Sequence, residues 1–243
     1  MKASGESTQD VTALADLLKA YAPHDGSFEL KIPGAHAIRR SRTNAELVHG
    51  VQLSALCIVA QGAKSVMLGR EVFEYDATRL IAFSVDVPVA SRIMRASPAE
   101  PFLCLRLDLD PQRIAGLVLK VFPHGLPRVT DIGAVCVAEA DVRIINAAVR
   151  LVELMAEPGD AQLLAPLVVD EILIRLLRSH IGARIAQIGL ADTGVYGVEK
   201  AVLVLQRKEG GAMLGQVAFD GKDRFNFKLL GAPPEDTGLT FSR

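Results

Sequence analysis

The chain has 243 residues, half of them hydrophobic, and its 27 basic and 28 acidic side chains leave a net charge of −1 at pH 7. This length allows one large core, or one core with a small appendage. The near-neutral balance shows no sign of the basic surface that nucleic-acid binding requires. No apolar run is long enough for a membrane span, and the polar N-terminus does not resemble a signal peptide. We therefore expect a cytoplasmic protein without membrane contact.

Residues 8–21 predict a helix, because their apolar side chains recur at helical spacing. Residues 51–109 predict a series of short strands with tight turns, including a two-residue hairpin turn at Gly69 and Arg70. In residues 102–110 leucines alternate with Cys104, Arg106 and two aspartates, which is the period of a strand. Strands this short at this spacing favour a barrel or a sandwich.

Helical periodicity begins after Asp110, which has the properties of an N-cap and precedes a proline. Further helices are expected over residues 142–156, with Asp141 as cap and Pro158–Gly159 as stop, over 165–180 and over 195–207. The remaining residues are rich in glycine and proline, so we expect an irregular tail with short strands near 215–219 and 224–230.

The sequence gives little indication of catalysis. None of the five histidines pairs with another at the two-residue spacing that places metal ligands on one face of a strand. Phosphate-binding and nucleophile motifs are absent, and the three cysteines lie among apolar neighbours as buried thiols usually do. We expect no metal, no cofactor and no enzymatic activity.

Three arginines on predicted strands are the candidates for a binding site. Arg92, Arg95 and Arg106 each have apolar neighbours, so each either faces solvent on a half-buried sheet or points into a cavity. In the second case a guanidinium pairs an anionic effector through a forked contact. The sequence leaves both alternatives open.

The helices over 142–156 and 165–180 carry wide apolar stripes. Either both pack within the chain, or one of them contacts a partner. The candidate dimerisation residues are Ile145, Val149, Val152, Ile172 and Leu176.

Several stretches in order resemble one branch of the AraC-type bacterial transcriptional regulators. They are "CIVAQGAK" (57–64), "EYD" (74–76), "SVDVPV" (84–89), "SPAEPFLCLRLDLDP" (97–111), "LAPLVVDEILIRLLRS" (164–179) and "GARIAQIGLADTGVYGVEKAV" (182–202). The resemblance implies a cupin-like β-barrel that senses an unidentified small molecule, followed by helices that form a homodimer. In such regulators a C-terminal domain with two helix-turn-helix units then binds DNA.

The resemblance predicts an α+β fold with three parts. Residues 1–138 form the N-terminal helix and the sensing barrel, residues 139–207 form the dimerisation helices, and residues 208–243 form an irregular tail. This tail stands where the resemblance places DNA-binding helices, although its "KLLGAPPEDTG" is similar to the last residues of such regulators. An internal deletion, a frame change and a genuine short form all remain open. We therefore expect a sensing and dimerising module that does not bind an operator by itself. The alternatives are a cupin-like metal-dependent enzyme, which the histidine spacing disfavours, and an interaction partner of full-length regulators.

Overall fold

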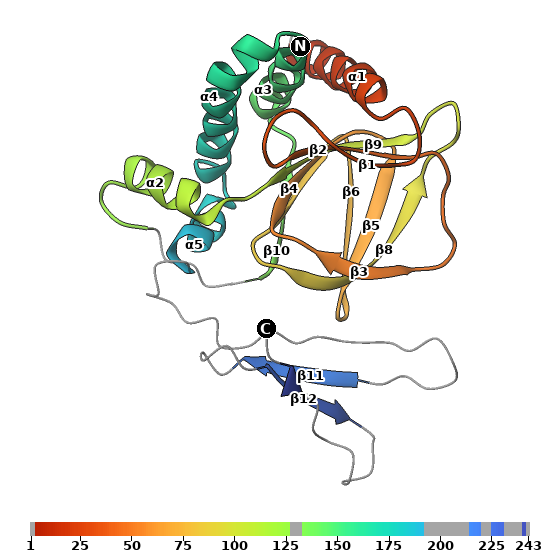
Figure 1. Ribbon diagram of the computed structural model, residues 1–243, viewed down its shortest axis with the longest axis vertical. Coiled ribbons are helices and arrows are strands. Elements are labelled where there is room, and N and C mark those ends of the chain that lie inside the picture. The colour runs from red at the N-terminus through yellow and green to blue at the C-terminus, as the bar shows by residue number, and fades with distance from the viewer. Residues whose placement is uncertain (1–2, 127–132, 192–213, 220–224, 231–239, 242–243) are drawn as a thin grey trace. The chain divides into compact units, whose positions relative to one another are not determined.

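The computed structural model describes the backbone of residues 3–126, 133–191, 214–219, 225–230 and 240–241, and the side chains of residues 8–126 and 133–189 (Figure 1). The chain divides into two compact units, Met1–Gly189 and Leu190–Arg243. Each unit is described by itself.

The strands of the first unit form two antiparallel sheets. The larger sheet has six strands in the order β1-β2-β9-β4-β7-β10, namely β1 (Gly26–Glu29), β2 (Ala35–Arg40), β9 (Phe102–Asp108), β4 (Ala55–Gln61), β7 (Arg79–Phe83) and β10 (Val135–Glu139). The smaller sheet has four strands in the order β3-β8-β5-β6, namely β3 (Val48–Gln52), β8 (Val87–Arg95), β5 (Ala63–Leu68) and β6 (Glu71–Asp76).

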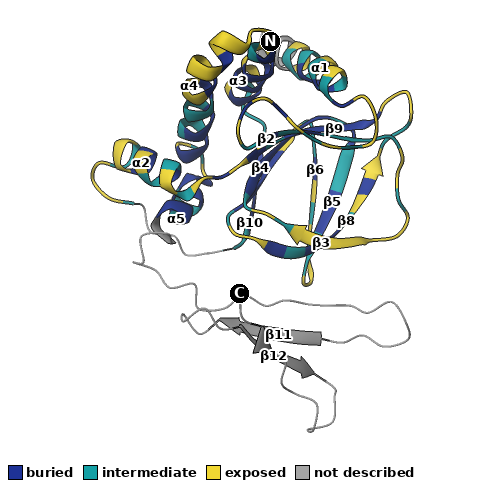
Figure 2. Cartoon of the chain, viewed as in Figure 1, coloured by how far each residue is buried: buried dark blue, intermediate teal, exposed yellow. Residues whose placement is uncertain are grey.

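Helices cover one face of the six-stranded sheet. They are α1 (Ala3–Tyr21), α2 (Pro111–Val121), α3 (Val142–Glu153), α4 (Pro158–Leu177) and α5 (Gly182–Ala191), with a short 3-10 turn at Leu154–Ala156 between α3 and α4. The central strands β4 and β9 are buried on both faces, as the dark blue of β4 in Figure 2 shows. The first unit therefore has three layers, with the six-stranded sheet in the middle.

Two apolar clusters lie on either side of this middle layer. Leu103, Leu105 and Leu107 of β9 belong to the cluster under the helices. Phe102 and Cys104, which alternate with them, belong to the cluster between the two sheets. The alternation predicted for this strand is confirmed, and each of its faces is buried against a different layer.

The expected α+β class is confirmed, whereas the cupin-like closed barrel is not. Among the described residues, no hydrogen-bonded ladder joins the four-stranded sheet to the six-stranded one. The two sheets contact each other through side chains instead, so the strands form a sandwich. Strand lengths and turns do not distinguish a barrel from a sandwich, because closure depends on which edge strands pair.

The expected hairpin turn is confirmed between β5 and β6, where Gly69 has a φ of 60°. This left-handed conformation is one that glycine adopts at little cost. The N-caps are confirmed as well. The Asp110 carboxylate accepts a hydrogen bond from the Gln112 amide at 2.9 Å, and Asp141 accepts one from the Arg143 amide at 2.8 Å.

The prediction for the start of α4 is wrong, because a helix was expected from residue 165 but α4 begins at Pro158, whose missing amide hydrogen is not needed in the first turn. The end expected for the preceding helical residues is confirmed, because they end at Ala156. Pro166 lies inside α4, which nevertheless continues to Leu177. Helix α5 was not expected as a separate element. The helix expected over residues 195–207 lies outside the described residues.

The second unit contains the antiparallel strands β11 (Leu214–Phe219), β12 (Phe225–Leu230) and β13 (Thr240–Phe241), in that order. Strands β11 and β12 pair in register from Leu214 opposite Leu230 to Phe219 opposite Phe225. The short strands expected near 215–219 and 224–230 are therefore confirmed.

Candidate effector site

The face of the six-stranded sheet that contacts the smaller sheet carries both apolar and polar side chains. Phe83 of β7 and Val135 of β10 lie opposite each other and are buried there. On the other side of β4, the register places His36 of β2 opposite Arg106 of β9, and Arg106 opposite Cys57 of β4. Arg106 stands two residues after Cys104 on β9, so its side chain points to the same inner face of the sheet as Cys104.

Arg106 and His36 share one carboxylate. The Arg106 guanidinium approaches Oδ1 of Asp108 with Nε at 3.0 Å and Nη2 at 2.8 Å. The other oxygen of Asp108 lies 3.3 Å from His36 Nε2. The side chains of Arg106 and His36 are each 18% exposed, so this cluster is half-buried and its charges are less screened than on an open surface.

The four-stranded sheet contributes a second cation to the same region. Lys64 of β5 faces the inner side with Val66, which is buried between the sheets. A hydrogen bond with the Cys104 thiol lowers the pKa of Cys57, and the nearby charges of Lys64 and Arg106 lower it further. The two cations, one from each sheet, therefore both act on the buried Cys57.

The structure does not bring Arg92 and Arg95 to this place. Arg92 alternates with the buried Ile93 and is exposed on the outer face of the four-stranded sheet. Arg95 is 67% exposed and pairs with Asp76, with Nη2 and Oδ2 3.5 Å apart. Of the three arginines expected from the sequence, only Arg106 lies against the space between the sheets.

The candidate dimerisation residues lie inside a single chain. Ile145, Val149, Val152, Ile172 and Leu176 are between 0% and 7% exposed and belong to the cluster under the helices. They hold α3 and α4 against the rest of the chain, so they are not available to a partner in this structure. The exposed apolar residues of α4 are instead Leu163, Leu164 and Leu167, which are 74%, 42% and 63% exposed.

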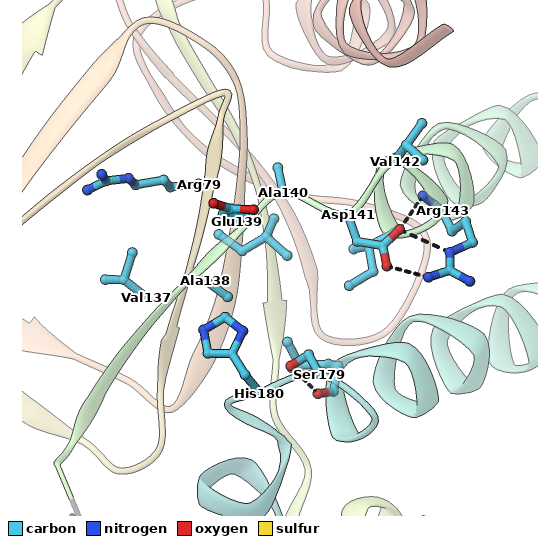
Figure 3. Close-up of a pocket in the computed structure, with 13 residues that line it drawn as sticks. Arg79, Val137, Ala138, Glu139, Ala140, Asp141, Val142, Arg143, Ser179 and His180 are labelled. Atoms are coloured by element: carbon cyan, nitrogen blue, oxygen red, sulfur yellow. Dashed lines mark hydrogen bonds and ion pairs between the residues drawn. The ribbon is translucent and has the colours of Figure 1, made fainter. Parts of the chain in front are cut away.

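A large cleft lies between β10 and the helices, with a volume of about 940 Å³ (Figure 3). Its wall combines Arg79 and Glu139 from the sheet with His180 from the turn after α4. Arg143 donates two hydrogen bonds to Asp141 across the start of α3, and these bonds lower the pKa of that carboxyl. The charged groups of this wall are balanced in sign, and Arg143 is already paired with Asp141.

Two further features bear on function. Among the side chains that the structure describes, no group of three or more His, Cys, Asp or Glu residues is arranged to hold a metal ion. Of the helices described, none is both long enough and apolar enough to cross a membrane.

The model of the AraC-type transcriptional regulator N-terminus matches residues 31–184, which is more than half of the chain. The chain therefore belongs to this family. The matched residues include both sheets and the helices α2, α3 and α4, apart from β1 at the edge of the larger sheet.

Solved structures of ToxT from Vibrio cholerae are similar to the chain at low identity. One, of strain O395, is 8% identical with a TM-score of 0.44, and the match covers 69% of this chain and 64% of that one. A second, bound to (E)-4-(8-methylnaphthalen-1-yl)but-3-enoic acid, is 9% identical with a TM-score of 0.43 over 58% of this chain and 55% of that one. The chain thus matches between about half and two-thirds of the ToxT chain. No curated protein sequence matches this chain.

Sequence analysis missed His36 and Lys64, which come from β2 and β5. The alternation along β9 does place Asp108 on the same face as Arg106, two residues away. The register between strands, which brings His36 and Lys64 to this face, has no local signal.

Proposed function

We propose that the chain is the small-molecule-sensing module of an AraC-type transcriptional regulator. The observation that carries this proposal is the pair of cations, Arg106 and Lys64, one on the inner face of each sheet, beside the buried apolar cluster between the sheets. We place the effector site there, within a sandwich that we interpret as an open form of the cupin-like barrel expected for residues 1–138.

The chemistry of this site favours an anion with an apolar part. A carboxylate is the natural partner of a guanidinium, and Asp108 already occupies Arg106 in this way. An effector carboxylate would replace Asp108 as the partner of Arg106. Asp108 would then still have His36 within hydrogen-bonding distance. Beyond the cations, the buried cluster between the sheets offers contact to an aliphatic or aromatic tail.

A thermal-shift titration tests the site. The probes are short-, medium- and long-chain aliphatic monocarboxylates, with alcohols of the same lengths as neutral controls. Binding at a ligand concentration of about 100 Kd stabilises the folded chain by about 2.7 kcal/mol. Arg106→Gln and Lys64→Gln should each remove most of the shift, whereas Arg92→Gln, at an exposed position outside the site, should keep it. Equal shifts in the Arg92→Gln and Arg106→Gln chains would refute the assignment.

We also propose that residues 139–207 serve dimerisation, through the exposed surface of α4 formed by Leu163, Leu164 and Leu167. A smaller cleft of about 500 Å³ beside this surface is lined by Leu164 and Leu167. Leu167→Glu places a charge in a surface that needs to lose water on association, and it leaves the core untouched because Leu167 is 63% exposed. Sedimentation velocity should then show a weaker dimer, with Leu119→Glu on α2 as the control, because Leu119 is 77% exposed and lies outside this surface.

As a member of this family the chain is proposed to act in the cytoplasm, without catalysis. The described strands of the second unit, β11, β12 and β13, do not supply the recognition helix of a helix-turn-helix unit. We propose that this chain alone does not recognise an operator. A gel-shift assay over a range of salt concentrations tests this, since sequence-selective binding that persists at high salt would contradict it.

A further inference from the structure

The outer face of the four-stranded sheet carries no layer of its own among the described residues. The cluster under the helices contains no residue of β3, β5, β6 or β8, and the described helices all lie on the far side of the six-stranded sheet (Figure 1). Apolar side chains are exposed on this face, with Val51 at 65% and Val72 at 52%. Strand β3, at the edge, is exposed along nearly its whole length (Figure 2).

The charges on this face are arranged in rows across three strands. The register places Arg92 of β8 and Glu74 of β6 on either side of Ser65 of β5. The next row has Ala90 and Val72 on either side of Met67. Arg92 and Glu74 are both exposed, and within the described part of the chain neither makes an ion pair. The neighbouring Arg95 and Asp76, by contrast, do pair across Ala63.

We propose that this face binds the same face of a second copy of the chain, around a two-fold axis that runs along β5. Such an axis exchanges the positions of β8 and β6, which lie on either side of β5 at strand spacings of about 4.8 Å. Arg92 then meets Glu74 of the partner subunit, and Glu74 meets the partner's Arg92. In the next row Met67 meets its own copy, and Ala90 meets Val72 of the partner subunit. The face is therefore complementary to itself in both charge and apolar contact.

The contact area defines how strong this association is. Around this axis β8, β5 and β6 overlap with their copies, whereas β3 lies beyond the partner's edge strand β6. Three strands at about 4.8 Å spacing and five residues at about 3.4 Å each give a face of roughly 250 Å². This is less than half of the area that each partner buries in a standard interface, so the face forms a weak dimer that depends on concentration and salt. It is separate from the α4 surface, and a chain with both surfaces forms assemblies larger than a dimer.

Charge reversal distinguishes this interface from any other. In a Leu167→Glu background, which weakens the α4 surface, Arg92→Glu places a carboxylate opposite Glu74 twice in each dimer. Glu74→Arg places two arginines opposite each other in the same way. Each single reversal should weaken self-association about tenfold, because two attractive pairs become two repulsive ones. An equimolar mixture of the two variants should associate again, because both contacts of a mixed dimer are attractive. In one contact Glu74 of the Arg92→Glu chain meets Arg92 of the Glu74→Arg chain, and in the other the two substituted side chains meet with their charges exchanged. A dimer of either variant with itself has two repulsive contacts.

Sedimentation equilibrium of each variant alone and of the mixture gives the measurement, and circular dichroism confirms that both variants fold. The control pair is Lys19→Glu and Asp16→Lys on α1, where the same reversals are made on a surface outside the interface. These variants should associate like the Leu167→Glu chain, alone or mixed. A Leu167→Glu chain that stays monomeric at all concentrations, or a mixture of the Arg92→Glu and Glu74→Arg chains that associates no better than its components, overturns the proposal. Either result leaves the effector site of Arg106 and Lys64 untouched, because the two sites lie on opposite faces of the small sheet.

Discussion

Gly62, between β4 and β5, has a backbone conformation and surroundings that only glycine fits. Its φ is 82°, and a Cβ atom at this position would lie 2.5 Å from the carbonyl oxygen of Arg95 and 2.8 Å from the Cα of Phe102. Both neighbours are backbone atoms of strands in different sheets, so neither yields without moving a strand. The short link between the two sheets depends on this close approach.

Gly62→Ala should therefore lower the free energy of unfolding by at least about 2 kcal/mol, because the strain of a left-handed alanine adds to the steric clash. Gly69→Ala is the matched control. Gly69 has a φ of 60°, but no atom lies within 4 Å of the point where its Cβ would stand, so only the strain of about 1 kcal/mol remains. Urea denaturation of both variants measures the difference. Equal losses would mean that the close packing at Gly62 contributes nothing.

Single residues also show how far sequence reasoning reaches. The capping roles of Asp110 and Asp141 were predictable because a cap is a local device, complete within a few residues. The alternation of β9 places Arg106 on the face opposite its leucines, but neither this alternation nor the apolar neighbours of Arg92 indicate which face of the strand is covered. Which face of a strand is covered depends on the layer packed against it, and that layer comes from distant parts of the chain.

Helix α5 contacts α2 at a point where a side chain has no room. A Cβ atom at Gly189 would lie 2.5 Å from the amide nitrogen of Ala115 and 2.8 Å from its Cα. Gly189→Ala should push the two helices apart and destabilise the chain by about 1–2 kcal/mol, despite the better helix propensity of alanine. Gly116→Ala, on α2 with no atom within 4 Å, should stabilise it by about 0.5–1 kcal/mol for the same propensity reason. Thermal unfolding measures the change in stability of both variants. If Gly189→Ala stabilised the chain, the close contact between α5 and α2 would be contradicted.

Helices α3 and α4 are connected by a carboxylate between two arginines. Glu171 accepts a hydrogen bond from Arg150 of α3 at 2.5 Å and from Arg175 of its own helix at 2.6 Å. The hydrogen bond from Arg150, followed by that from Arg175, lowers the pKa of Glu171 below its ordinary value of 4.5. The ionised form is thus favoured in the folded chain, and the stability it contributes is fully present above pH 4.5 and is lost as pH falls through the lowered pKa.

Glu171→Gln should cost about 1 kcal/mol at neutral pH, and this difference from the native chain should shrink as the pH falls below the ordinary pKa of the carboxyl. Denaturation curves at a series of pH values measure it. Glu153→Gln on α3 serves as the control, because Glu153 is exposed and makes no ion pair among the described residues. A difference that stays constant through the acid range would show that Glu171 acts by packing rather than by charge.

Some helices and strands were easier to predict from the sequence than others. Helix α1 and strand β9 have clear periodicity and were found where the sequence predicts them, although α1 begins at Ala3 rather than at residue 8. Their pattern of burial follows directly from one repeated spacing. The predicted start of α4 lies too late in the sequence because a proline such as Pro158 is compatible with two structures. It can follow the end of one helix, and it can stand in the first turn of the next. Only the path of the following residues decides between them.

At the scale of the whole molecule, the sequence predicted a β-rich sensor followed by helices but not how its sheets close. Barrel and sandwich use the same short strands and the same turns, and they differ in the pairing of edge strands such as β3, β6 and β10. That pairing is a property of the assembled layers. The same limitation explains why the candidate dimerisation residues are buried within the chain. An apolar stripe that packs on a sheet and one that packs on a partner look alike in the sequence.

The middle sheet belongs to both apolar clusters, so the first unit should unfold as one cooperative structure. Phe83 of β7 lies in the cluster between the sheets and Leu105 of β9 lies in the cluster under the helices, and both are 0% exposed. Phe83→Ala and Leu105→Ala should each lower the free energy of unfolding by about 3–4 kcal/mol, through lost burial and the cavities they leave. If the layers are coupled, either substitution destabilises both clusters equally.

The buried thiols report this coupling directly, because Cys104 lies between the sheets and Cys136 lies under the helices. Alkylation of each thiol across a denaturant series, followed by mass analysis of the peptides, gives a separate midpoint for each cluster. In the native chain and in both variants the two midpoints should coincide and should shift together. If Leu105→Ala instead exposed Cys136 at a lower denaturant concentration than Cys104, the helices would be able to leave the sheet on their own. A ligand held between the sheets would then have no mechanical connection to α3 and α4, whereas coincident midpoints mean that a ligand bound at the site proposed beside Arg106 would stabilise the helical layer as well.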